Sequence, residues 1–147
     1  MSHVRQQIRD DIVTTLTGLT TTGSNVFRSR IFPLEETNLP ALCIYTKSET
    51  SEYDTIGLPR SVNRVLDVAV EAYVKGVSNY DNTLDTIAVQ MEEAIAADIT
   101  LGGLAKDAQI TAFEADFAGD GEQPVAVGRF TVTVDYRTVE NDVETAA

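Results

Sequence analysis

A chain of 147 residues with 43% hydrophobic residues is long enough to form one domain with a substantial core. Its formal charge of −12 argues against binding to a phosphate backbone, because that binding depends on Lys and Arg displacing counterions. No apolar run approaches the roughly 20 residues that cross a bilayer, and a single cysteine excludes an internal disulfide and fits a reducing compartment.

Two segments have the spacing of amphipathic helices. Residues 3–17 repeat apolar side chains at intervals of four, with Ser2 as a candidate N-cap and Gly18 as a candidate stop. Residues 80–97 show the same kind of stripe. The stripes consist of Val4, Ile8, Ile12 and Leu16 in the first helix and of Leu84, Ile87, Ala88, Met91 and Ile95 in the second.

Five segments are predicted as strands, at residues 26–32, 41–46, 61–75, 108–118 and 125–138. The third is the clearest, because it alternates along its length except at Arg64, which interrupts the apolar face near its outer end, where its long side chain can reach water. Its apolar face contains Val62, Leu66, Val68, Val70, Ala72 and Val74, and its solvent face contains Ser61, Asn63, Asp67 and Glu71. The alternation of residues 108–118 changes phase near Ala112, which predicts a β-bulge there.

The predicted order is therefore α-β-β-β-α-β-β within one domain of residues 1–138. The simplest α+β architecture for this order is a mostly antiparallel sheet of four to five strands, with both helices packed on its apolar face. Residues 139–147 are acidic and lack periodicity, so we expect a flexible tail.

The residue inventory does not favour catalysis. His3 is the only histidine and lies close to a chain end, where it makes a poor general base. The apolar neighbours of Cys43 predict a buried structural thiol. One histidine and one cysteine cannot build a typical zinc site, and no phosphate-binding loop is present. We therefore expect no enzyme activity, no metal and no cofactor.

The connector of residues 47–59 is the strongest candidate for a functional surface. Connections beyond about 12 residues are uncommon and tend to be functional or disordered. A flexible acidic loop is the alternative, but three apolar side chains favour a surface that a partner covers. The candidate interface residues are Glu49, Glu52, Tyr53, Asp54, Ile56, Leu58 and Arg60.

One known family shares the pattern of this chain. Residues 28–46 form two strand-like runs joined by a segment that Pro33 and Pro40 bound, and Tyr136-Arg137-Thr138 ends the last strand. With the order of helices and strands, this pattern resembles the tail terminator proteins of long-tailed bacteriophages. The subunits of that family form a hexameric ring that caps the finished tail tube, ends its polymerisation and joins it to the head.

The resemblance implies a set of partners. They are further copies of the chain, the major tail tube protein and a head–tail connector or neck protein, with duplex DNA passing through the ring without specific binding. It also implies assembly in the host cytoplasm, a final place in the tail or neck of the virion, and contact of residues 47–60 with a neighbouring subunit or the tube.

Other interpretations stay open at this point. The charge of −12 fits a solvated acidic surface that aids solubility, or a surface past which DNA moves without sticking. The chain could be a different neck or head–tail connector protein of similar size. It could also be a small cytoplasmic dimeric α+β enzyme or ligand-binding domain, and the oligomeric state distinguishes these classes.

Overall fold

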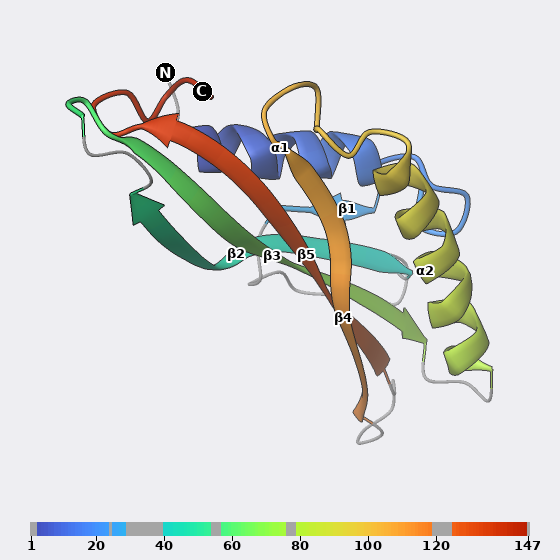
Figure 1. The fold of residues 1–147 in the computed structure, drawn as a ribbon. Helices are drawn as coiled ribbons and strands as arrows, with labels where there is room; N and C mark the ends of the chain where they lie inside the picture. Colours follow the sequence, from blue (N-terminus) through green and yellow to red (C-terminus); the bar gives the residue numbers. More distant parts are fainter. Residues whose placement is uncertain are drawn as a thin grey trace.

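The computed structural model describes residues 3–23, 25–28, 40–53, 57–75, 79–118 and 125–146. These residues form two helices and a five-stranded mixed sheet in the predicted order, which confirms the α+β fold (Figure 1). The elements are α1 (Val4–Leu16), β1 (Val26–Phe27), β2 (Ala41–Tyr53), β3 (Ser61–Lys75), α2 (Tyr80–Ala96), β4 (Asp107–Ala118) and β5 (Val125–Val139).

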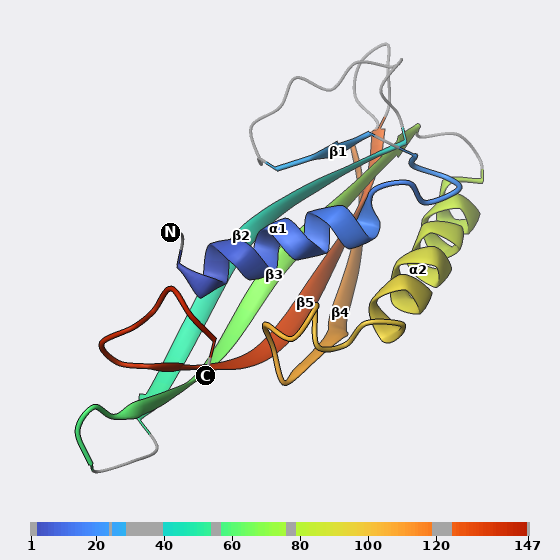
Figure 2. The ribbon, with the colours of Figure 1, turned by 90° about the horizontal axis from the view of Figure 1, so that it is seen from above.

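The strands lie in the order β1-β2-β3-β5-β4, and β3 is the central strand. Only the short β1 runs parallel to its neighbour, whereas the other three pairs are antiparallel. Both helices cover the same face of the sheet, as Figure 2 shows. Within the described residues, the opposite face of the sheet carries no helix.

Strand β3 pairs with β5 along all of its 15 residues. The residues predicted for its apolar face are all buried, and those from Leu66 to Val74 belong to one core cluster with the buried residues of α1 and α2. The prediction for its other face is wrong at one position, because Glu71 is only 2% exposed. Strand alternation identifies the face on which a side chain lies, but it does not show whether a charged partner allows burial there.

Two β-bulges interrupt the ladders. The bulge predicted near Ala112 is confirmed, since the pairing of β4 with β5 shifts between Ile110 and Ala112. A second bulge was not predicted and lies between Thr46 and Ser48, where Lys47 is the extra residue of β2. After each bulge the side chains of the strand exchange faces.

The second bulge explains why the predicted end of β2 was wrong. The strand expected to end at residue 46 continues to Tyr53, so residues 47–53 belong to β2 rather than to a long connector. These residues have no apolar alternation, yet they pair with the first half of β3, which supplies the regular backbone partners. Of the first predicted strand, Val26 and Phe27 form β1, and residues 29–32 lie outside the described part of the chain.

Helix α1 begins and ends where local side-chain and backbone chemistry favour it. The predicted cap, Ser2, lies outside the described residues, and His3 caps the helix instead by accepting a hydrogen bond from the backbone N–H of Arg5 at 2.9 Å. The predicted stop at Gly18 is confirmed, because its φ of +93° is a conformation that glycine adopts with little strain.

The residues after β5 lie against the start of α1. The backbone N–H of Val4 donates to the carbonyl oxygen of Val143 at 2.8 Å, and the Gln7 side chain donates to the carbonyl oxygen of Glu144 at 2.8 Å. The division into a domain of residues 1–138 and a flexible tail of residues 139–147 stays a prediction.

Gly128 of β5 provides a test of how tightly α2 packs on the sheet. A Cβ atom there would lie 3.0 Å from the Phe113 ring and 3.1 Å from Leu84. We expect Gly128→Val to lower the free energy of unfolding by about 1–3 kcal/mol through overpacking, measured by urea denaturation. Gly57→Val is the matched control, because no atom lies within 4 Å of that position. Equal stability of both variants would contradict the described packing.

Candidate interaction surface

The outer parts of β2 and β3 extend beyond the helices. Residues 48–53 and 57–66, called the β2–β3 end below, form the part of the sheet that projects past the beginning of α1 (Figures 1 and 2). Five of the seven predicted interface residues are described, and all five lie in this segment. Asp54 and Ile56 lie outside the described residues.

The tip of the β2–β3 end combines exposed apolar groups with one ordered arginine. Leu58 is 83% exposed and Tyr53 is 55% exposed. The Arg60 guanidinium lies over the Tyr53 ring at 4.4 Å from its centroid, and its Nε donates to Glu140 at 2.8 Å. Cation–π contacts at exposed sites contribute about 0.5–1 kcal/mol, so this contact favours the observed position of the Arg60 guanidinium over the Tyr53 ring.

Glu49 lies at the base of the projection, with its side chain 9% exposed. It accepts hydrogen bonds from the guanidinium of Arg5 on α1 at 2.6 Å and from that of Arg64 on β3 at 3.3 Å. The hydroxyl of Tyr136 on β5 donates to its other carboxylate oxygen. Arg64 also donates to Thr138 at 3.1 Å. These four residues, Glu49, Arg5, Arg64 and Tyr136, are called the Glu49 cluster below.

The Glu49 cluster joins α1 and three strands at the point where the projection leaves the body of the domain. Burial opposes ionisation of Glu49, but hydrogen bonds from Arg5 and Tyr136 and the nearby arginine charges outweigh it, so the pKa of Glu49 is lowered. Burial and the adjacent carboxylate raise the pKa of Tyr136. Glu49 is therefore ionised at neutral pH. Its carboxylate connects the base of the β2–β3 end to α1 and β5 through hydrogen bonds from Arg5 and Tyr136.

A second charged group lies on the helix-free face. The buried Glu71 accepts a hydrogen bond from the Arg129 Nε at 2.9 Å and another from the Tyr73 hydroxyl at 3.1 Å. Burial and the Glu71 carboxylate raise the pKa of Tyr73 to about 12 and that of Cys43 to about 11. A thiol with this pKa is a poor nucleophile at neutral pH, so Cys43 is structural, in line with its predicted burial.

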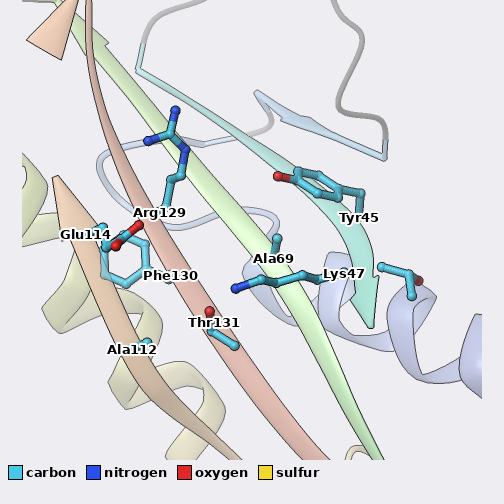
Figure 3. Close-up of a pocket in the computed structure, with 9 residues that line it drawn as sticks. Tyr45, Lys47, Ala69, Ala112, Glu114, Arg129, Phe130 and Thr131 are labelled. Carbon is cyan, nitrogen blue, oxygen red and sulfur yellow. The ribbon is translucent and has the colours of Figure 1, made fainter. Parts of the chain in front are cut away.

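The helix-free face also carries a hollow of about 600 Å³ (Figure 3). Small residues of the central strands, such as Ala69 and Thr131, leave space between the larger Tyr45, Lys47 and Arg129. The lining mixes apolar with polar side chains, and of its two cationic residues, Lys47 and Arg129, the second already binds Glu71. The hollow therefore has the character of a surface depression of mixed polarity.

Among the described residues, no group of three or more His, Cys, Asp or Glu side chains is placed to hold a metal ion. In the same part of the chain, no helix has the length and apolar character needed to cross a membrane.

Residues 3–129 match the family described as phage minor tail protein U, and the chain belongs to this family. It is a structural protein of the phage tail and a component of the virion.

Two other comparisons add little. No curated protein matches the chain. A chain from the virion of a native gene transfer agent particle is similar at 12% identity, over 90% of this chain and 92% of that one, with a TM-score of 0.39. A likeness at this level supports no conclusion about function.

The sequence analysis identified residues of the projection but did not predict the hydrogen bonds and ion pairs that connect it to the domain. It grouped Glu49 with the surface residues, whereas the Glu49 side chain is only 9% exposed and bonds the buried Tyr136, which lies 87 residues away in the chain. The available signal was Arg64, a charged residue on an otherwise apolar strand face, which predicts a carboxylate partner on the adjacent strand. For Glu71 and Arg129 the sequence carries no comparable signal.

The lowered pKa of Glu49 predicts how stability depends on pH. A carboxyl group whose pKa is lower in the folded state stabilises the fold above its unfolded pKa, and this stability is lost as the pH falls through the folded pKa. We expect Glu49→Gln to lower the free energy of unfolding at pH 7 by about 2 kcal/mol, because hydrogen bonds from charged groups are lost.

The difference in the free energy of unfolding between wild type and Glu49→Gln should become smaller as the pH falls below 4. Urea denaturation at a series of pH values between 3 and 7 measures this difference. Tyr136→Phe is the control, since it removes one hydrogen bond and keeps the carboxylate and both arginines. A difference for Glu49→Gln that is independent of pH would contradict the assigned ionisation.

The environment of Cys43 predicts slow alkylation. With a pKa of about 11 and 1% exposure, its labelling by iodoacetamide at pH 8 should be more than about a hundredfold slower than that of an ordinary thiol. Mass spectrometry of the native protein, with the urea-unfolded protein as control, measures the ratio. Equal rates in both states would show that the Cys43 thiol is accessible and has an ordinary pKa in the native protein.

Proposed function

We propose that this chain is the tail terminator of a long-tailed phage. In this proposal, its copies form a ring, of six subunits by resemblance to tail terminators, that occupies the end of the tail tube. Membership of the phage minor tail protein U family over residues 3–129 carries the proposal. The protein acts by binding, needs no catalytic residue or cofactor, and ends tube polymerisation by covering the surface to which the next tube subunit would add.

The β2–β3 end is the proposed contact surface. It presents Leu58 and Tyr53 to solvent on a base that the Glu49 cluster fixes, so little conformational entropy is lost when a partner covers them. Glu52 and Arg60 are the polar residues around these two side chains. We assign Glu49 a supporting role, because its carboxylate is already bonded within the subunit.

The charge of the chain supports the rest of the proposal. With a formal charge of −12, the ring repels duplex DNA, which can then pass through the opening without specific binding. The tail tube protein on one side and a head–tail connector or neck protein on the other are the proposed partners, assembled in the host cytoplasm.

The oligomeric state and capping activity test the proposal together. We expect negative-stain electron microscopy and native mass spectrometry to show closed rings of six copies. Added to polymerising tail tube protein, the chain should stop tube growth. A compact dimer that leaves tube growth unchanged would contradict the proposal and favour a ligand-binding domain.

A substitution at the tip tests the contact surface. We expect Leu58→Asp to abolish rings while the melting temperature stays near that of wild type, because an 83% exposed side chain contributes little to the fold. Leu58→Met is the matched control and should keep the rings. Normal rings of Leu58→Asp would show that the tip does not contact a neighbouring subunit.

A further inference from the structure

The first turn of α1 is held by acceptors from two separate parts of the chain. The first backbone N–H groups of a helix have no partner within the helix and need acceptors from elsewhere. The N–H of Val4 donates to the carbonyl oxygen of Val143 at 2.8 Å, and that of Arg5 donates to the Nδ1 atom of His3 at 2.9 Å. The carbonyl oxygen of His3 accepts from the next two amides, at 2.9 and 3.2 Å. His3 and Val143 together therefore accept from the first four amides of α1.

A histidine side chain caps a helix in this way only while its ring is neutral. An imidazole nitrogen accepts a hydrogen bond when it carries no proton, whereas both nitrogens of an imidazolium are donors. The common N-cap residues Ser, Thr and Asn keep an acceptor oxygen throughout the pH range in which histidine titrates. Protonation of the His3 Nδ1 atom would leave the Arg5 N–H without its acceptor and would add a positive charge at the positive end of the helix dipole.

The surroundings of His3 also oppose its protonation. Burial lowers the pKa of His3, the charges of Arg5 and Arg64 lower it further, and Glu49 acts in the opposite direction. The Glu49 carboxylate already accepts hydrogen bonds from both arginines and from Tyr136, so its charge is largely balanced. A histidine whose pKa is lower in the folded state makes the fold less stable as the pH falls from its unfolded pKa, about 6.5, through its folded pKa.

The segment after β5, residues 140–146, lies against the same turn of α1 (Figure 2). At its beginning, the Glu140 carboxylate accepts hydrogen bonds from Arg60. Further along, Val143 accepts from Val4, and the carbonyl oxygen of Glu144 accepts from the Gln7 side chain at 2.8 Å. The hydrogen bonds that α1 makes to the middle of this segment therefore come from the turn that His3 caps.

We propose that His3 is a pH-sensitive cap, which fastens residues 140–146 to α1 at neutral pH and releases them in acid. When the ring is neutral, its Nδ1 atom holds the Arg5 N–H, and Val4 and Gln7 are in position to bind the segment. When the ring takes up a proton, the Arg5 N–H loses its acceptor and the first turn frays. The hydrogen bonds from Val4 and Gln7 to the segment are then lost as well. This device is a property of the single subunit and does not depend on the proposed ring.

Hydrogen exchange of the full chain, without a histidine tag, at pH values from 7.5 to 4.5 tests the cap. Exchange of the His3 Cε1 hydrogen, measured by mass spectrometry, gives the pKa of the ring, because His3 is the only histidine. Amide exchange is measured in peptides from the beginning of α1 and from residues 140–146, with a peptide from α2 as the reference for the intrinsic effect of pH. We expect both peptides to exchange about fivefold or more faster, relative to α2, as His3 is protonated, with the same midpoint, below pH 6.5.

Two variants separate His3 from other groups that titrate. His3→Asn keeps an acceptor that does not titrate in this range, so both peptides should stay protected down to pH 5. His3→Ala removes the acceptor, so both peptides should exchange rapidly at every pH while the α2 peptide stays protected. Loss of protection in His3→Asn at the wild-type midpoint would assign the change to another group and overturn the proposal. Asp11 on α1 is such a group, since burial and the nearby Asp98 raise its pKa.

Three further results would also overturn the proposal. The first is a His3 ring that titrates while neither peptide changes its exchange. The second is slower exchange of residues 140–146 in acid, which would show that a protonated His3 attracts the acidic Asp142 and Glu144 rather than releasing the segment. The third is a ring that stays neutral down to pH 4.5.

Discussion

The ionic and hydrogen-bonding cluster around Glu49 is the constraint on which the projecting part of the structure depends. The outer half of β2 has few apolar residues, so hydrophobic burial alone does not hold it against the domain. Instead a single carboxylate, 9% exposed, bonds α1 through Arg5, β3 through Arg64 and β5 through Tyr136. An unpaired charge at such a site is costly, so the arrangement is stable only when all its members are in place.

This constraint gives the two ends of β2 and β3 different roles. At the inner end, the strands bury their apolar residues under both helices and form the core. At the outer end, Tyr53 at the end of β2 and Leu58 before the start of β3 are exposed.

The sequence predicted the parts of the fold that follow regular periods. Both helices, the whole of β3 and the bulge in β4 were predicted because apolar residues alternate or repeat there. The extension of β2 was missed, because a bulge at Lys47 and a run of polar residues conceal it. Of the candidate site, the sequence identified the tip but not its support, since Arg5, Glu49 and Tyr136 meet only through tertiary packing. The burial of Glu71 by Arg129 was unpredictable for the same reason.

The claim that the Glu49 cluster makes the β2–β3 end a preformed contact surface is tested most directly by hydrogen exchange of the isolated subunit at pH 7. Peptides from residues 48–53 and 61–66 should be protected in the wild type. In Glu49→Gln they should exchange faster, while a peptide from α2 stays unchanged. If residues 48–53 exchange in the wild type as rapidly as an unfolded chain, or if Glu49→Gln alters nothing there, the β2–β3 end does not depend on this cluster.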